Sequence, residues 1–200
     1  GQTAPTAAND LPIRVYTGTV NWRYAGDRWV NEAQFTPQQY LWQQIPRDAT
    51  TIGRDFQGIL RIGGSQAAQQ FTQNRFSLRN DLTRSAVQLA GDHVFKVGAN
   101  LDLLGYRGIK DLARNPLFTY TNDNAYAVPD RVVFGGGNPA IRTTNTQAGV
   151  YAQDDWRVGR RLTLNLGVRW DVETNPINNA YVTPRALADS LRGPLALAFG

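Results

Sequence analysis

The clearest pattern in the chain is an alternation of apolar and polar residues between positions 161 and 172. Successive side chains of a β-strand point to opposite faces, so strict alternation predicts a strand with one apolar and one polar face. The apolar set comprises Leu162, Leu164, Leu166, Val168, Trp170 and Val172, and the other set comprises Arg161, Thr163, Asn165, Gly167, Arg169 and Asp171.

The residues before this strand alternate in the same way, with Asp154 as the one carboxylate on the apolar side. A slip of one residue would reverse every side chain, so the two apolar faces coincide only if an odd number of residues joins the strands. We therefore predict a three-residue loop, Val158-Gly159-Arg160. This register pairs Ala152 with Leu166, Val150 with Val168, Trp156 with Leu162, Gln153 with Asn165, and Tyr151 with Gly167, whose bare backbone the ring is expected to cover.

A second predicted hairpin lies upstream. FKVGANLDL (Phe95–Leu103) has the same pattern as LNLGVRWDV (Leu164–Val172), and residues 75–82 alternate before it. Asn80 interrupts the apolar side as Asp154 does, two residues before the last large apolar group of its strand. We expect the two residues to lie at the same depth of the sheet.

A third, weaker hairpin spans Ile13 to Trp42. Ala25 to Arg28 form its turn and residues 29–42 its return strand, which Pro37 is expected to bend or to place at an edge. A further short strand is predicted within Phe56–Gly63. One face of the first strand carries Tyr16, Gly18, Val20, Trp22 and Tyr24.

The connections between the hairpins differ in length on the two sides. Turns near residues 25–28, 91–92 and 159–160 are short, whereas residues 43–74, 107–143 and 174 onward form long connections rich in Gly, Asn, Pro and aromatic residues. Short turns on one rim and long loops on the other are typical of outer-membrane β-barrels. The alternation also lasts for the ~9–11 residues of a membrane strand, and not for the ~5–6 of a globular one.

These patterns predict an all-β fold: an antiparallel up-and-down meander that forms part of a transmembrane β-barrel. Lipid would face the apolar side, and a wet or plugged lumen would face the polar side. Trp156 and Trp170 would belong to the two aromatic girdles that flank the lipid-facing band. We expect residues 1–200 to be a piece of one barrel domain, with hairpins at about 13–42, 74–106 and 143–174.

Composition narrows the functional classes. The net charge is +5, but the Arg residues are scattered and form no basic run, so nucleic acid is not an expected partner. The absence of Cys excludes disulfides and thiolate metal sites. No apolar stretch approaches the ~18 residues of a membrane-spanning helix, and no signal peptide is visible. The chain begins with Gly1 and contains no Met, which favours a processed product or an internal piece of a longer protein.

The sequence predicts no enzyme: we assign no catalytic, cofactor-binding or metal-binding residue, and the ligand-binding residues are unknown. His93, the only histidine, is expected to be structural or interfacial. Asp154 and Asp155 are neighbours on one strand and therefore point to opposite faces. Asp102 and Asp171 share the polar face with Asn100 and Arg169, which favours ion pairing in the lumen.

The segment between Arg107 and Thr143 holds the remaining candidates. VVFGGGNPA (Val132–Ala140) is rich in glycine but lacks the Lys and the strand–helix context of a phosphate loop, so it is expected to be a plain loop. Aromatic residues in this segment either contact a ligand from outside or only order the loop, and the sequence does not decide between the two. They are Phe118, Tyr120, Tyr126 and Phe134.

Three segments resemble TonB-dependent outer-membrane receptors. GVYAQDDWRVGRRLTLNLGVRWD (Gly149–Asp171) resembles a barrel hairpin of that family. NDLTRSAVQLAGDHVFKVGANLD (Asn80–Asp102) is similar to another, with its Gly-x-His turn and its Lys-x-Gly strand. WVNEAQF (Trp29–Phe35) resembles the Asn-Glu strand of the large receptors that carry a carboxypeptidase-regulatory-like N-terminal domain. The similarity extends over most of residues 13–176.

The resemblance implies a Gram-negative outer membrane, a 22-stranded barrel with a plugged lumen and energised uptake of a large or scarce ligand. Implied partners are the outer-membrane lipid, the remainder of the barrel with its plug, and the TonB complex, which engages the N-terminal part. The plug and the TonB box are absent from these 200 residues. About six strands cannot close such a barrel, and Leu195 to Gly200 do not resemble a finished strand, so an internal barrel segment is expected.

Two alternatives remain open from the sequence. One is a passive porin or a small structural barrel, in which Phe56–Gly63 and a neighbouring segment supply extra strands. The other is a soluble β-sandwich binding module, in which a second sheet covers the apolar face. On the barrel hypothesis, Asp154 is expected near the periplasmic interface, where a lipid-facing carboxylate costs roughly 0–1 kcal/mol.

Overall fold

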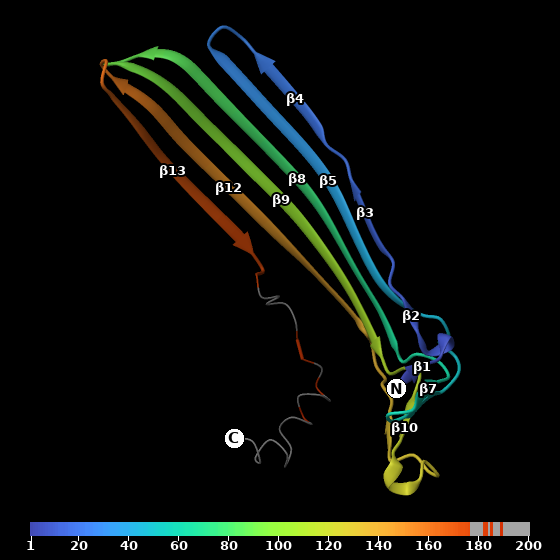
Figure 1. Ribbon diagram of the computed structural model, residues 1–200. Helices are drawn as coiled ribbons and strands as arrows, with labels where there is room; N and C mark the ends of the chain where they lie inside the picture. Colours follow the sequence, from blue (N-terminus) through green and yellow to red (C-terminus); the bar gives the residue numbers. More distant parts are fainter. Residues whose placement is uncertain (177–181, 184, 186–188, 190–200) are drawn as a thin grey trace.

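Five long strands form one antiparallel meander (Figure 1). The computed structural model describes residues 1–176, 182, 183, 185 and 189. The long strands are β5 (Trp29–Pro46), β8 (Ala67–Gln88), β9 (Asp92–Leu112), β12 (Ala140–Val158) and β13 (Leu162–Thr174). Three short strands pair along the free side of β5: β2 (Asn9–Asp10), β3 (Ile13–Thr17) and β4 (Val20–Ala25). The sheet is open, with β13 at one edge and β2 to β4 at the other.

The apolar face of this sheet has no second layer over it among the described residues. Large apolar side chains on that face remain widely exposed, from 37% for Leu101 to 70% for Val168. In a β-sandwich these side chains would pack on another sheet. The described residues therefore do not form the sandwich of the soluble alternative, and the apolar face requires an apolar surrounding.

The hairpin of β12 and β13 confirms the expected faces but not the expected register. The loop has three residues, as the alternation requires, yet it comprises Gly159, Arg160 and Arg161, because Val158 pairs with Leu162. Gly159 has a φ of +74°, a backbone conformation that glycine adopts without strain. The pairing is shifted by two residues from the predicted one, so Trp156 lies opposite Leu164 and Tyr151 opposite Arg169. A shift of two preserves every face, so the alternation alone does not distinguish the two registers.

Pro37 does not break its own strand. β5 continues through it and is paired with β8 on one side, with Pro37 opposite Phe76. The interruption lies across from it, in the gap between β3 and β4, where the Gly18 N–H donates to the Pro37 carbonyl over 3.1 Å. In an antiparallel ladder the N–H and the C=O of one residue point to the same neighbouring strand. The side of Pro37 that lacks an N–H therefore faces this gap. The expectation of a bend or an edge in β5 is wrong because its neighbour accommodates the proline.

The long connections fold into a second, smaller sheet at one end of the meander. Its strands are β1 (Gln2–Thr3), β6 (Gly53–Phe56), β7 (Leu60–Ile62), β10 (Leu117–Tyr120) and β11 (Arg131–Val133), in the order β1-β7-β6-β10-β11. The predicted strand at Phe56–Gly63 is therefore two strand segments around a turn. Both belong to this loop sheet and not to the meander, so they supply no extra barrel strands. Two of its pairings are parallel, β1 with β7 and β6 with β10, unlike the purely antiparallel meander.

Most of the buried residues lie in and around the loop sheet. Leu117 and Thr119 of β10 are buried, as are Ala7, in the 3-10 helix η1 (Pro5–Ala7), and Ala113. A second 3-10 helix, η2 (Asn122–Asn124), follows β10. Asp48 caps the first connection by accepting from the backbone N–H groups of Thr50 and Thr51 at 2.8 and 3.0 Å. The side-chain hydrogen bond of Thr51, together with these backbone bonds, holds the pKa of Asp48 well below its ordinary value.

The long strands extend past the alternating segments. β8 begins at Ala67 and β9 ends at Leu112, so both reach well into the predicted loops. Their lengths of 22 and 21 residues exceed the ~9–11 that a membrane crossing needs. Among the described residues no helix is long and apolar enough to cross a membrane. The C-terminal residues 195–200 lie outside the described part of the chain.

Two expectations about depth are wrong. Asn80 lies eight residues before the end of β8, whereas Asp154 lies four before the end of β12, so the two residues are not equivalent. Trp156 pairs with Leu164, and Trp170 lies six residues farther along β13. At about 3.3 Å per residue and a 40° tilt, these six residues rise roughly 15 Å through the membrane. That is short of a band ~25 Å tall, so Trp156 lies near the short turns but Trp170 lies within the band.

Candidate functional site: the polar face of the sheet

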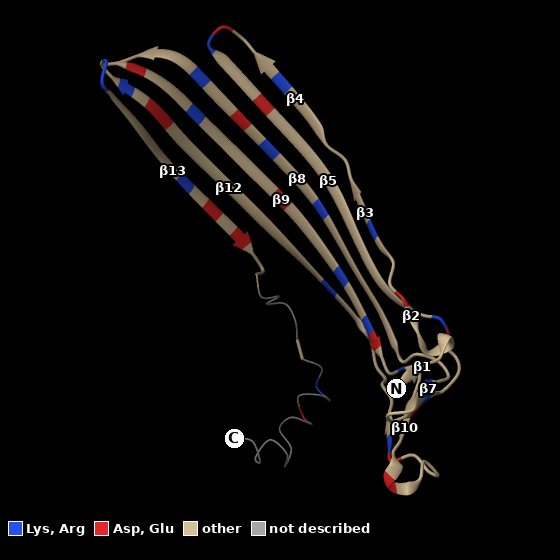
Figure 2. Cartoon of the chain, viewed as in Figure 1, with Lys and Arg blue, Asp and Glu red and all other residues tan. Residues whose placement is uncertain are grey.

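The polar face is built from side chains that the pairing of five strands brings into rows. One row runs Glu32, Asp81, Gly98, Tyr151 and Arg169 across β5, β8, β9, β12 and β13. The next row runs Gln34, Arg79, Asn100, Gly149 and Asp171. Charged residues of both signs alternate across the strands in the half nearest the short turns (Figure 2). Each row contains one glycine, in a different strand.

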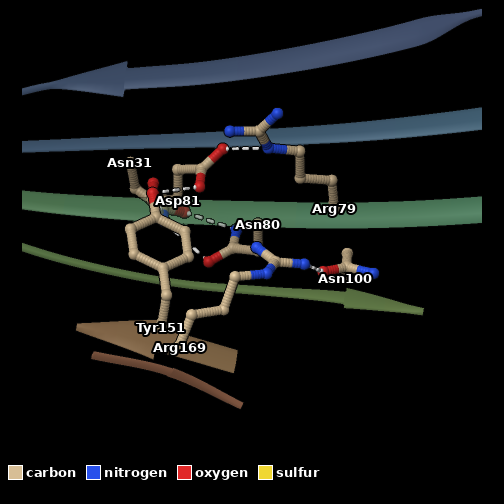
Figure 3. Close-up of polar contacts among 7 residues, drawn as sticks. All are labelled: Asn31, Arg79, Asn80, Asp81, Asn100, Tyr151 and Arg169. Carbon is tan, nitrogen blue, oxygen red and sulfur yellow. Dashed lines mark hydrogen bonds and ion pairs between the residues drawn. The ribbon is translucent and has the colours of Figure 1, made fainter. Parts of the chain in front are cut away.

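The glycine of the first row lets a side chain cross its strand. Tyr151 of β12 extends over Gly98 of β9, and its hydroxyl donates to Oδ1 of Asp81 on β8 over 2.6 Å (Figure 3). A Cβ atom on Gly98 would collide with the Tyr151 ring and with Asp81. Asp81 also accepts from Arg79 over 2.6 Å. The expectation that Tyr151 covers Gly167 is wrong: the ring covers a glycine of the neighbouring hairpin, and Gly167 lies opposite Gln153.

The glycine of the second row is crossed from the other direction. Arg169 of β13 reaches over Gly149 of β12, and its guanidinium donates to Oδ1 of Asn100 on β9 over 3.0 Å (Figure 3). The same guanidinium donates to both carboxylate oxygens of Asp171, at 2.8 and 2.6 Å. Added bulk at Gly149 would meet all three of these side chains. The two glycines therefore allow bonds between strands that are not adjacent.

Two further groups of polar contacts lie on this face. Asp102 accepts from Arg75 over 3.0 Å and from the hydroxyl of Ser77, and Asp155 accepts from Lys96 over 2.8 Å and from Gln153 over 2.7 Å. The Arg75–Asp102 pair borders a concavity of about 420 Å³. It is lined in part by Arg75, Arg79, Asp81, Asn100, Tyr151 and Arg169. Ionic side chains that satisfy one another make a stiff polar wall and leave little unpaired charge to bind a small ion.

His93 and Asp154 lie on the opposite, apolar face. Nδ1 of His93 lies 2.7 Å from Oδ2 of Asp154, and Nε2 lies 2.7 Å from the carbonyl oxygen of Leu89. Both partners accept hydrogen bonds. Two hydrogens are therefore needed for the two bonds of the ring, whereas a neutral imidazole carries only one N–H. The imidazole stacks between Phe95 and Trp156. Asp154 thus lies near the short turn on the apolar face, as expected, but as half of an ion pair with His93 and not as an exposed carboxylate.

The other polar residue predicted on the apolar face, Asn80, is also partnered. Its side chain hydrogen-bonds that of Asn31 on β5, and Asn31 donates in addition to the Asp81 carbonyl, both over 3.0 Å (Figure 3). Paired amides on that face reduce the cost of placing them against an apolar medium.

Two of the four aromatic residues named in the long loop, Tyr120 and Tyr126, lie against Phe56. Phe56 of β6 stacks on Tyr120 with ring centroids 4.7 Å apart, and Tyr126 lies tilted against Phe56. Phe134 lies apart and is 73% exposed. The glycine-rich segment after β11 is irregular, and Gly135 donates to the Ala113 carbonyl. Among the described residues, no cluster of three His, Cys, Asp or Glu could hold a metal ion.

The sequence identified some members of the polar network and missed others. Asp171 does lie with Arg169 and Asn100, whereas Asp102 pairs with Arg75, which lies 27 residues earlier. Tyr151 and Asp81, separated by 70 residues, were not anticipated as a pair. The sequence did offer one signal for these contacts: Gly98 and Gly149 each lie on the polar face of a strand. A glycine within a strand often marks a close approach of another group.

The family model for the outer membrane beta barrel domain matches residues 5–185. This match covers most of the 200 residues. The chain belongs to the outer membrane beta barrel domain family. Its apolar face therefore contacts the lipid of a Gram-negative outer membrane, its short turns are periplasmic, and its long loops are extracellular. Outer-membrane lipid is thus a partner of the chain, as the sequence predicted.

One sequence relative and one solved structure are similar to the chain. The TonB-dependent transporter Oar of Myxococcus xanthus is 30% identical over 127 residues, which cover 56% of this chain and 12% of that protein. The outer membrane transporter YddB of Escherichia coli superposes with a TM-score of 0.62 at 11% identity, over 83% of this chain and 22% of its own. Both relatives are transporters and not enzymes. The chain spans about an eighth of the first and about a fifth of the second.

Proposed function

We propose that this chain is an internal barrel segment of a TonB-dependent receptor that imports a large or scarce ligand by energised uptake. The receptor would be of the large kind, with a carboxypeptidase-regulatory-like N-terminal domain and a plug. Residues 1–200 would be one part of a single barrel domain. Its partners would be the rest of the barrel, the plug, and the TonB complex acting through the N-terminal part.

The polar face is the observation that carries the proposal. Its charges are cross-linked over several strands, through Tyr151–Asp81 and Arg169–Asn100, and together they present a preformed wall. A plug domain docked in the lumen needs such a surface, because its polar groups must be satisfied where water is excluded. The relation to the TonB-dependent transporter Oar supports energised uptake over passive flow.

A conductance measurement separates a plugged receptor from a porin. The protein would be expressed from its complete gene, purified in detergent and inserted into a planar lipid bilayer. We expect no steady open pore, because a plug fills the lumen. A variant lacking only the plug domain should conduct. A stable open conductance from the complete protein would contradict the plugged receptor and favour a porin.

Energy coupling requires its own readout. The purified periplasmic domain of the host TonB protein would be titrated onto the same detergent-solubilised protein. We expect specific binding that is lost when only the N-terminal TonB box is removed. If the complete protein is closed in the bilayer but does not bind this domain, a closed barrel stands and energised uptake fails.

A further inference from the structure

The lipid-facing side of the sheet carries a polar groove at its extracellular end. Nine residues line it, and six of these lie on the same face as Phe76 and Leu103, because they stand at even spacing from residues of that face along β8, β9 and β12. Tyr106, Thr143 and Asn175 line the rest of it. We name it the rim groove; its volume is about 570 Å³. Its residues on this face are Thr72, Asn74, Gly105, Arg107, Arg142 and Thr144.

Two arginines face each other in this groove. Arg107 of β9 and Arg142 of β12 are directly opposite in the ladder, and both are exposed. Like charges opposite each other destabilise a sheet unless an anion lies between them. Among the described residues no carboxylate forms an ion pair with either. The nearest acid on the same face of β9, Asp111, is bonded to Arg114 over 2.9 Å.

The floor of the groove is open. Gly105 lies between Asn74 and Thr144, and a Cβ atom built on it would meet nothing within 4 Å. Hydroxyl and amide groups on the walls can donate hydrogen bonds to an anion. The guanidinium groups of Arg107 and Arg142 supply the forked, charged donors that match phosphate geometry. The groove thus combines a hollow, two cations and neutral donors, which is the chemistry of a phosphate site.

The depth of the groove indicates where the phosphate comes from. Along β9 the apolar face extends from His93 to Leu103, ten residues, or about 25 Å of membrane at a 40° tilt. Arg107 lies four residues farther on, roughly 10 Å beyond the apolar band. Arginine side chains at such positions extend toward lipid headgroups. We propose that the rim groove binds the phosphate group of a lipid in the outer leaflet, with the acyl chains lying along the apolar face below it.

This proposal depends on the outer-membrane placement of the sheet and not on energised uptake. The test uses the protein expressed from its complete gene in a non-ionic detergent, with the bisphosphorylated glucosamine lipid lipid A as the probe. Bound lipid would be measured by native mass spectrometry across a titration. The variant R107Q/R142Q is expected to bind the lipid at least about tenfold more weakly, because both charged donors are lost. Dephosphorylated lipid A should bind the unmodified protein as weakly as that variant binds the phosphorylated lipid.

Two further variants separate the groove from general positive charge. K110Q/R131Q removes two exposed cations outside the groove and should bind lipid A as the unmodified protein does. Gly105→Leu fills the hollow while both arginines stay, and should weaken binding. Heat-dependent gel mobility confirms that each variant forms the barrel.

Three outcomes would overturn the proposal. The first is equal binding by R107Q/R142Q and the unmodified protein. The second is an equal loss of binding in K110Q/R131Q. The third is displacement of the lipid by inorganic phosphate at the same concentration, which would make the site one for free phosphate and not for lipid.

Discussion

Replacing Gly98 with valine is expected to destabilise the barrel by about 3 kcal/mol. The new side chain collides with the Tyr151 ring, and overpacking of this kind costs roughly 1–3 kcal/mol. The displaced Tyr151 also loses its hydrogen bond to the Asp81 carboxylate, a bond to a charged group worth roughly 1.5–3 kcal/mol. Urea unfolding of the complete protein in detergent, followed by tryptophan fluorescence, measures the change.

Gly105 in the same strand provides the matched control. A side chain there meets no atom within 4 Å, so Gly105→Val should change the unfolding free energy by less than about 0.5 kcal/mol. If Gly98→Val and Gly105→Val are equally stable, Tyr151 does not lie across Gly98, and the described polar network is wrong.

Breaking the His93–Asp154 pair should also destabilise the barrel. His93→Leu leaves the Asp154 carboxylate on the lipid-facing side without its partner, in a pair whose side chains are only 8% and 19% exposed. A charge left without its partner in a little-exposed place destabilises the folded state. The ring also loses its stacking between Phe95 and Trp156, which leucine replaces only in part.

The double variant H93L/D154L distinguishes the ion pair from simple packing. With both charges gone, the site matches the apolar medium, and the protein should recover most of the lost stability. Unfolding free energies of the two single variants and the double variant form the required cycle. If the double variant loses as much unfolding free energy as the two single variants together, His93 and Asp154 do not interact across β9 and β12.

The sequence predicted the faces of the sheet because a period of two is visible in single strands. Leu162 to Val172 all lie on the predicted sides, and the loop after Val158 is odd. It could not predict the register, because a shift by two residues leaves the same side chains on the same faces. The loop therefore comprises residues 159–161 instead of 158–160.

Contacts between hairpins were harder to predict for a related reason. Within one hairpin Tyr151 faces β13, and Gly167 was the only strand glycine considered there. An interior strand has two neighbours, and the glycine that receives the ring, Gly98, belongs to the other one. The pairing of β9 with β12 follows a connection of 27 residues, whose length sets no register. His93 could be recognised as structural, but its partner Asp154 could not be identified.

The strand ends show a third limit. Alternation fades before Phe76 in β8, where most residues on both faces are polar, yet the backbone pairing of β8 with β9 continues to the loop sheet. Polar residues outside a membrane lose the contrast between faces that a sequence pattern detects. The rim groove lies in this zone, which is why Arg107 and Arg142 were assigned to a long loop.

The central claim is that one face of this sheet contacts lipid and the other lines a lumen. Single cysteines along β13, in a chain that has none of its own, would carry spin labels from residue 162 to residue 172 of the complete protein in lipid bilayers. Collision with oxygen, which concentrates in lipid, should be high at Leu164, Leu166 and Val168 and low at the residues between them. Collision with a water-soluble nickel complex should alternate in the opposite sense. A uniform profile along β13, or the reverse alternation, would contradict the account.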